Sequence, residues 1–247
     1  MSAAPWFGSH GAIYPKNSSR KVVSKVKKRM LDLFCGRLGW SEAFLARGWE
    51  CVGVDLVEPP KIPQGCRFIK QDVSDIWATG GWVHMDNEFA CIWSESFDLI
   101  CASPPCEQFS TMRNFRPPVP YPELGIKLFN HTRTICEGSG IPYIMENVAG
   151  AGRFVGRAIN HCGSYYLWGS AVPPILPQNI RKGMTQLAMG LRERKGEPGW
   201  NNRHGQRGQT PTELVATVPP ELANCVAEYA ERLLEQKSGS SIAEPCA

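Results

Sequence analysis

Short apolar segments alternate with amphipathic ones between residues 29 and 147. Segments 29–34, 50–55, 67–71, 97–103 and 141–147 have the length and character of strands, whereas 40–48 and 122–138 have helical spacing. The second helical segment has one apolar stripe, formed by Leu124, Leu128, Phe129, Thr132, Ile135 and Cys136. This alternation predicts an α/β fold with a doubly wound, mostly parallel sheet and helices on both faces.

Beyond residue 147 the chain becomes rich in glycine, proline and aromatic residues, and then basic as far as residue 209. This stretch predicts a small lobe or loops beside the sheet. Helical spacing returns at Pro219, with apolar positions at Leu222, Cys225, Val226, Tyr229 and Leu233. We therefore expect a flexible basic arm at 1–28, an α/β domain at 29–168, an irregular region at 169–209, a returning segment at 210–237 and a tail at 238–247.

Composition allows one domain with its own core, because 43% of the 247 residues are apolar. The ten cysteines show no C-x-x-C pair or zinc-ligand spacing, so we expect reduced thiols in a cytosol and no bound metal. No segment has membrane-spanning length or the pattern of a secretion signal, which predicts a soluble protein inside the cell. Two basic zones, 16–29 and 181–207, are either solvated faces or phosphate-binding surfaces.

The segment from Leu31 to Asp55 has the order strand, glycine turn, helix and second strand, and it ends in an acidic residue. Gly36 and Gly39 would let the backbone approach a ligand closely, and Asp55 could bind ribose hydroxyls. Asp72 follows the third strand, where an adenine amino group would need an acceptor. The pattern predicts a nucleoside cofactor, but a plain tight turn would use the same glycines.

Cys106 follows a buried strand and the rigid sequence Ser103-Pro104-Pro105, which would present it at the carboxyl edge of the sheet. A thiolate there would be a nucleophile if the site helps to remove its proton. Alternatively, Cys106 is one more inert buried thiol. Glu146 ends another apolar strand, where a carboxyl of raised pKa could hold or donate a proton, or could bond to backbone amides as a structural residue.

Together these segments resemble the cytosine-5 DNA methyltransferase family over most of the chain. DLFCG with Asp55 resembles the family's cofactor turn, SPPCEQFS its nucleophile loop and MENV its acid motif. ATVPPELANCVAEYA resembles its last motif, which folds back onto the cofactor site. The resemblance implies a Rossmann-like, S-adenosylmethionine-dependent methyltransferase fold, in which 29–168 is catalytic and 169–209 is a small irregular target-recognition lobe.

The family's motifs also imply site residues. Cys106 and Glu146 would be catalytic. Cofactor contacts are expected from Asp32, Phe34, Cys35, Gly36, Gly39, Trp40, Asp55, Leu56, Asp72, Val73, Pro104, Thr217 and Val218. Substrate contacts are expected from Ser103, Gln108, Ser110, Arg113, Asn147, Arg153 and Arg157.

The implied reaction is methylation of carbon 5 of cytosine in double-stranded DNA. The thiolate of Cys106 would add to carbon 6 while Glu146 assists at ring nitrogen 3, and carbon 5 would then accept the methyl group. Because the target is stacked in a duplex, the cytosine would have to be flipped out. Loop 107–116 could close over it, with Arg113 and Arg116 as candidate phosphate contacts.

The chain departs from the family pattern at several positions. Arg37 and Leu38 stand where a further glycine is usual, and Ala216 stands where asparagine is common. The arginine-rich motif after the acid motif has no counterpart, so Arg153 and Arg157 replace it by position only.

The likeness is greatest to small phage-encoded or orphan enzymes, and the role, in restriction-modification or in regulation, stays open. The short 169–209 region predicts a short or relaxed recognition sequence, and we expect a monomer in the cytoplasm of a bacterial or phage-infected cell. An RNA cytosine-5 methyltransferase and a non-catalytic DNA-binding relative stay open as alternatives.

Overall fold

A seven-stranded sheet runs through the centre of the protein, in the order β3-β2-β1-β6-β7-β9-β8. The computed structural model describes residues 27–79, 82–85, 97–110, 122–178, 180 and 218–240. The strands are β1 Arg29–Leu33, β2 Glu50–Asp55, β3 Cys66–Lys70, β6 Leu99–Ala102, β7 Tyr143–Asn147, β8 Asn160–Cys162 and β9 Tyr165–Trp168. The first five in this order pair in parallel, and β9 is antiparallel to both of its neighbours.

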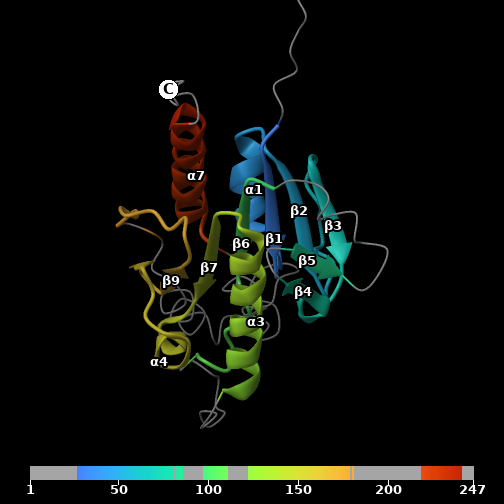
Figure 1. Ribbon diagram of the computed structural model, residues 1–247, viewed down its shortest axis with the longest axis vertical. Helices are drawn as coiled ribbons and strands as arrows, with labels where there is room; N and C mark the ends of the chain where they lie inside the picture. The colour runs from blue at the N-terminus through green and yellow to red at the C-terminus, as the bar shows by residue number, and fades with distance from the viewer. Residues whose placement is uncertain are drawn as a thin grey trace, which may run out of the picture.

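Helices cover both faces of this sheet (Figure 1). Helices α1 (Gly39–Ala46) and α7 (Pro220–Ser240) cover one face, and α3 (Glu123–Ser139) covers the other. Alternate side chains of one strand enter opposite layers because strand side chains have a period of two. In β1, Met30 packs with α1 and α7, whereas Leu31 packs with α3. The expected doubly wound, mostly parallel, Rossmann-like α/β fold is confirmed.

The buried stripe of α3 differs from the expected one at its first turn. Leu124 is 55% exposed, while Gly125, Phe129, Thr132, Ile135 and Cys136 are buried. Gly125 lies in the stripe because its missing side chain leaves room for the ring of Phe109, which would be 3.0 Å from a Cβ atom there. Leu124 is one position off the stripe and therefore faces away from the sheet.

The segment after Asn147 was expected to form a small lobe or loops beside the sheet, but residues 160–168 form two strands of the sheet itself. Strand β9 hydrogen-bonds to β7 inside the main sheet, and β8 forms the sheet edge. A two-residue connection containing Gly163, at φ 60°, joins them into a hairpin. The aromatic residues of β9 are good strand formers, Gly163 marks the hairpin turn, and Gly169 follows the last residue of β9.

Several short elements complete the described fold. A two-stranded antiparallel sheet consists of β4 (Ile76–Thr79) and β5 (Trp82–Met85). Short helical turns lie at η1 (Val73–Asp75), η2 (Ala149–Ala151) and α4 (Gly152–Val155). Helix α7 ends three residues beyond the expected boundary at residue 237.

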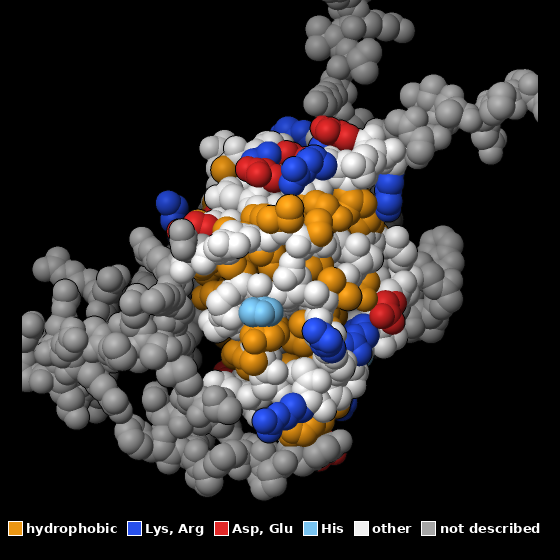
Figure 2. Space-filling view, turned by 90° about the vertical axis from the view of Figure 1, so that its left-hand side faces the viewer, with side chains coloured by type: hydrophobic (Ala, Val, Ile, Leu, Met, Phe, Trp, Pro, Cys, Tyr) orange, Lys and Arg blue, Asp and Glu red, His pale blue; other side chains and the backbone are white. Residues whose placement is uncertain are grey.

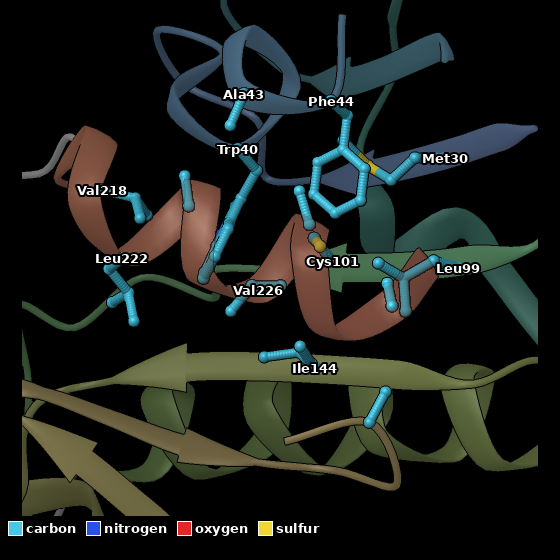
Figure 3. Close-up of a cluster of buried hydrophobic side chains, with 14 of the residues drawn as sticks. Met30, Trp40, Ala43, Phe44, Leu99, Cys101, Ile144, Val218, Leu222 and Val226 are labelled. Atoms are coloured by element: carbon cyan, nitrogen blue, oxygen red, sulfur yellow. The ribbon is translucent and has the colours of Figure 1, made fainter. Parts of the chain in front are cut away.

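Helix α7 brings the C-terminal segment back to α1 (Figure 3). Trp40 of α1 extends toward α7 beside Val218, Leu222 and Val226, and all four belong to one buried cluster. At the outer end of this contact Arg47 donates to Glu231 at 2.6 Å, and the indole nitrogen of Trp49 donates to the same carboxylate at 3.1 Å. The packing fixes Val218 close to the N-terminal half of α1.

Hydrophobic side chains form a band across the face on the α7 and β9 side, between charged groups (Figure 2). None of the described helices is long and apolar enough to cross a membrane. The N-terminal arm up to residue 26, the second basic zone and most of the expected target-recognition lobe lie outside the described residues. The domain boundaries proposed for these parts stay predictions.

Candidate functional site

Polar side chains gather where the parallel strands end. Because β1, β2, β6 and β7 run parallel, their carboxyl ends share one edge of the sheet, where open α/β folds bind ligands. The glycine turn, residues 34–38, follows β1, and Asp55 ends β2. The Cys106 loop, residues 103–110, follows β6, and Glu146 lies near the end of β7.

The turn between β1 and α1 contains three residues in the left-handed region: Phe34 at φ 55°, Gly36 at φ 48° and Leu38 at φ 64°. This conformation costs little for glycine but is strained for leucine and phenylalanine, and such strain is concentrated at ligand sites. Leu38 thus adopts the backbone conformation that glycine favours. Gly53 of β2 makes room for the turn, because a Cβ atom there would be 2.7 Å from Leu38 and 2.9 Å from Cys35.

Asp55 links the turn to the second strand. One carboxylate oxygen accepts from the Gly36 amide at 2.9 Å, and the other accepts from Val57 at 3.1 Å. Each oxygen keeps a free lone pair, so the carboxylate can also accept from ligand hydroxyls. The next side chain, Leu56, is 57% exposed.

The loop after β3 carries the second acidic position. Asp72 accepts from the Ser74 amide at 2.8 Å and begins η1, and Val73 behind it is buried. Gln71 is buried, and its side-chain amide has no hydrogen bond within the described structure. Gln71 also donates its backbone amide to the Asp55 carbonyl, and it directly precedes Asp72. It therefore lies beside both acidic residues that are predicted to bind the nucleoside. Sequence reasoning missed it, since no motif marks it.

Three expected cofactor residues are buried beneath the turn. Asp32 is fully buried and accepts from the hydroxyl of Ser41 in α1 at 2.7 Å. Its burial raises its pKa to about 7, although the Ser41 hydrogen bonds oppose that shift. Cys35 and Trp40 are also buried, while Gly39, at the start of α1, is partly buried. Their contacts with a cofactor stay predictions.

Cys106 lies in a tight loop after β6. Its carbonyl accepts from the amides of Phe109 and Ser110, each at 3.0 Å, which closes the loop as a turn. The side-chain Nδ2 of Asn147 donates to the Pro104 carbonyl at 2.9 Å, and this bond joins the loop to the end of β7. The Cys106 side chain is therefore held between two strand ends and is only partly exposed.

Glu146 influences the ionisation of Cys106, and burial influences both groups. Burial, followed by the negative charges of Glu146 and Glu107, raises the pKa of the Cys106 thiol to about 11. Burial raises the pKa of Glu146 to about 7, against a hydrogen bond from Ser103 that lowers it. Near neutral pH the thiol is protonated and the carboxyl is poised to hold or release a proton.

Ser103 connects this pair to the glycine turn. Its hydroxyl accepts from the indole nitrogen of Trp40 at 3.1 Å and bonds to Glu146. A hydroxyl has one proton, so the bond from Trp40 orients that proton toward the carboxyl. The arrangement fixes Glu146 relative to α1, and thus relative to the predicted cofactor turn.

Gly150 allows the two halves of the site to touch. It follows β7, and a Cβ atom there would overlap the carbonyl oxygen of Phe109 in the Cys106 loop. Phe109 is buried, and its ring stacks on that of Phe154 in α4 with the centroids 6.1 Å apart. Close approach of the loop to the segment after β7 therefore requires glycine.

We expect Gly150→Ala to lower the free energy of unfolding by about 1–3 kcal/mol, because backbone must shift to accept the methyl group. The shift would move the Cys106 loop away from Glu146, so the activity proposed below should fall as well. Gly152→Ala is the matched control, because a Cβ atom at Gly152 meets nothing within 4 Å. Chemical denaturation of both variants tests this, and equal stability would exclude the close approach.

Three other residues that were expected to contact the substrate lie in or next to the Cys106 loop. Gln108 accepts from the Gly125 amide at 2.8 Å and so ties the loop to α3. Asn147 is 1% exposed and bonds to Pro104 and Val148, whereas Ser110 is partly exposed.

The positions of the arginines that were expected to contact the substrate do not test that expectation. Arg153 and Arg157 are exposed, in and after α4, and neither is among the groups that shift the pKa of Cys106 or Glu146. Arg113, Arg116 and Thr217 lie outside the described residues, and Val218 is buried against α1. The expected contacts of all these residues with substrate or cofactor stay predictions.

No group of three or more potential metal ligands occurs among the residues that the structure describes. The described cysteines are all unpaired thiols, and Cys91 and Cys246 lie outside the described parts of the chain.

No family model and no curated protein matches the chain. Among solved structures it is similar to a triple mutant of Spodoptera frugiperda DNMT2, with a TM-score of 0.29 and 17% identity over 51% of this chain and 37% of that chain. It is also similar to Burkholderia thailandensis 1,6-didemethyltoxoflavin-N1-methyltransferase, crystallised with 1,6-didemethyltoxoflavin and S-adenosylhomocysteine, with a TM-score of 0.29 and 16% identity over 68% of this chain and 59% of that chain.

A third similar structure is the PH0226 protein from Pyrococcus horikoshii OT3, with a TM-score of 0.28 and 20% identity over 52% of each chain. The chain thus spans between 37% and 59% of the length of these three structures. Likenesses this distant leave the function to be argued from the geometry of the site.

Proposed function

We propose that this chain is an S-adenosylmethionine-dependent DNA (cytosine-5-)-methyltransferase. The observation that supports it best is the pairing of Cys106 with Glu146 at the edge of the sheet, next to a strained glycine turn. A thiol and a carboxyl of raised pKa are the two groups that addition to a pyrimidine ring needs. The resemblance of the surrounding motifs to the cytosine-5 family supports a cytosine substrate.

The residues present fit a nucleoside cofactor. Asp55 keeps acceptor capacity for ribose hydroxyls, and the buried amide of Gln71 lacks a partner in the described structure. Gly36 is exposed and has φ 48°, and nothing lies within 4 Å of its Cβ position, so a ligand can approach the backbone there. Asp72 and the exposed Leu56 would flank the base. When bound, the cofactor would supply an electrophilic methyl group on a positively charged sulfonium.

The chain's own residues account for the remaining steps. The thiol of Cys106 gives up its proton to solvent water, and its sulfur bonds to carbon 6 of the cytosine while Glu146 donates a hydrogen bond or proton to ring nitrogen 3. The electron density pushed onto carbon 5 forms the new bond to the methyl carbon. Solvent water then accepts the carbon 5 proton, the electrons of that bond form the double bond between carbons 5 and 6, the thiolate leaves carbon 6, and Glu146 takes its proton back from ring nitrogen 3.

An RNA cytosine-5 methyltransferase is the second candidate, because the same thiol and carboxyl would serve an RNA pyrimidine equally well. Competition between matched DNA and RNA duplexes for labelled methyl transfer separates the two proposals. Preferential labelling of RNA would overturn the DNA assignment and retain the chemistry. The motivation for a binding-only protein was the missing arginine motif, and the pairing of Cys106 with Glu146 argues against that alternative.

Incubation of the full chain with labelled S-adenosylmethionine and DNA of mixed sequence tests the proposed function. We expect label on carbon 5 of cytosine, and we expect bisulfite sequencing to give a short or relaxed site in the cytoplasmic DNA of a bacterial or phage host. A fixed site of six or more base pairs would contradict the second expectation. Transfer to neither DNA nor RNA would refute the proposed function.

A further inference from the structure

Tyr165 lies beside the catalytic pair, although no motif marks it. Glu146 of β7 and Leu167 of β9 are cross-strand partners, so their side chains lie on the same face of the sheet. Tyr165 precedes Leu167 by two residues and therefore shares this face, displaced toward the carboxyl end of β7. Its ring packs against the cluster formed with α1 and α7.

The hydroxyl of Tyr165 has no hydrogen bond within the described structure, although the side chain is only partly exposed. Tyrosine hydroxyls usually find a partner when they are buried. Burial, followed by the negative charges of Glu146, Cys106 and Glu221, raises its pKa to about 12. The hydroxyl is therefore neutral near pH 7 and is available to donate a hydrogen bond close to both catalytic groups.

The order of the strands shows which part of a substrate Tyr165 would meet. Along the sheet edge the cofactor turn follows β1, Cys106 follows β6, Glu146 lies on β7 and Tyr165 lies on β9. Carbon 5 of the cytosine must face the methyl donor on the β1 side. Carbon 2 lies directly across the ring from carbon 5, so its carbonyl oxygen faces the β9 side.

We infer that Tyr165 is a substrate-binding residue that donates a hydrogen bond from its hydroxyl to the carbonyl oxygen at carbon 2 of the flipped pyrimidine. The inference rests on the proposed function. This bond withdraws electron density from the ring and so assists addition of the thiolate at carbon 6. It would also supply a contact to the base that the sequence had assigned, by position only, to Arg153 and Arg157.

The decisive variant is Tyr165→Phe, which removes only the hydroxyl. Steady-state kinetics with a DNA duplex that the wild type methylates should show kcat/KM lowered roughly 10-fold, as expected for loss of one hydrogen bond. Because the hydroxyl has no partner inside the described protein, thermal stability should not fall. Tyr166→Phe is the matched control, because Tyr166 pairs with Asn147 on the opposite face and stacks on His161. It should change kcat/KM by less than about 2-fold.

Binding to the same duplex with an abasic site at the target position separates base contact from general weakening. Wild type and Tyr165→Phe should bind the abasic duplex equally, whereas the variant should bind the cytosine duplex more weakly. Equal kcat/KM of variant and wild type, or equal weakening on both duplexes, would overturn the role of Tyr165 and leave the proposed function intact. A wild-type protein that methylates no nucleic acid would instead refute the proposed function itself.

Discussion

Cys106→Ala is expected to abolish methyl transfer, with a loss on the order of 10,000-fold or more, as seen when a covalent nucleophile is removed. The reason is that carbon 5 of cytosine is a weak nucleophile until sulfur has added to carbon 6. DNA containing 5-fluorocytosine provides the sharpest measurement, because no base can remove the fluorine from carbon 5 as it removes the proton, so elimination is blocked and the adduct persists. Wild-type protein should give a covalent complex on a denaturing gel, and Cys106→Ala should give none.

Cys225→Ala is the matched control for this experiment. Cys225 is also a partly exposed thiol, but it lies on α7 and bonds to the Ile175 carbonyl at 3.5 Å. Its variant should form the covalent complex at the wild-type rate. Trapping that persists in Cys106→Ala would assign the adduct to another residue, and the mechanism proposed for Cys106 would be wrong.

The site residues that lie at the carboxyl ends of strands could be predicted, because each of them belongs to one continuous sequence motif. Gly36 and Asp55 belong to a single strand–helix–strand unit, so their order in the chain already places them at one sheet edge. The structure joins them by the bond from the Gly36 amide to the Asp55 carboxylate. Cys106 and Glu146 could likewise be recognised, because Cys106 follows an apolar strand and a Ser-Pro-Pro sequence, and Glu146 interrupts an apolar strand.

Contacts that depend on strand register were not predictable. Tyr165 lies on the same face as Glu146 because β9 pairs with β7 in the register that sets Leu167 opposite Glu146. The glycine-rich surroundings of β9 had instead predicted a small lobe or loops beside the sheet. Gly150 gave no signal either, because its role depends on a backbone atom of Phe109. Such requirements arise from tertiary packing between distant segments, which local sequence patterns do not encode.

The site lowers the stability of the protein at neutral pH. Asp32 and Glu146 ordinarily titrate near 3.8 and 4.5, but burial raises both pKa values to about 7. Between these values the unfolded chain loses protons that the folded chain keeps, so the free energy of unfolding falls as pH rises toward 7. A carboxyl kept in this unfavourable position next to a thiol is typical of a catalytic site.

Glu146→Gln is expected to lower kcat/KM roughly 100-fold and to change the shape of its pH profile. In the wild type, Glu146 keeps its proton below pH 7 while the thiolate fraction of Cys106 rises with pH, so kcat/KM rises. Above pH 7 Glu146 loses its proton, which offsets the further gain in thiolate, and the profile levels off. In the glutamine variant only the thiol titrates, so kcat/KM should keep rising through pH 7 toward the pKa of Cys106.

Glu107→Gln is the matched control, because Glu107 is an exposed carboxylate that also raises the pKa of Cys106. Removing its charge should lower the pKa of the thiol and shift the rising limb to lower pH, but the profile should still level off near pH 7. Methyl-transfer rates of the three proteins between about pH 5.5 and 9.5 distinguish charge from proton donation. A Glu146→Gln profile that levels off near pH 7 would show that the titrating acid is another group, because glutamine cannot lose a proton in this range.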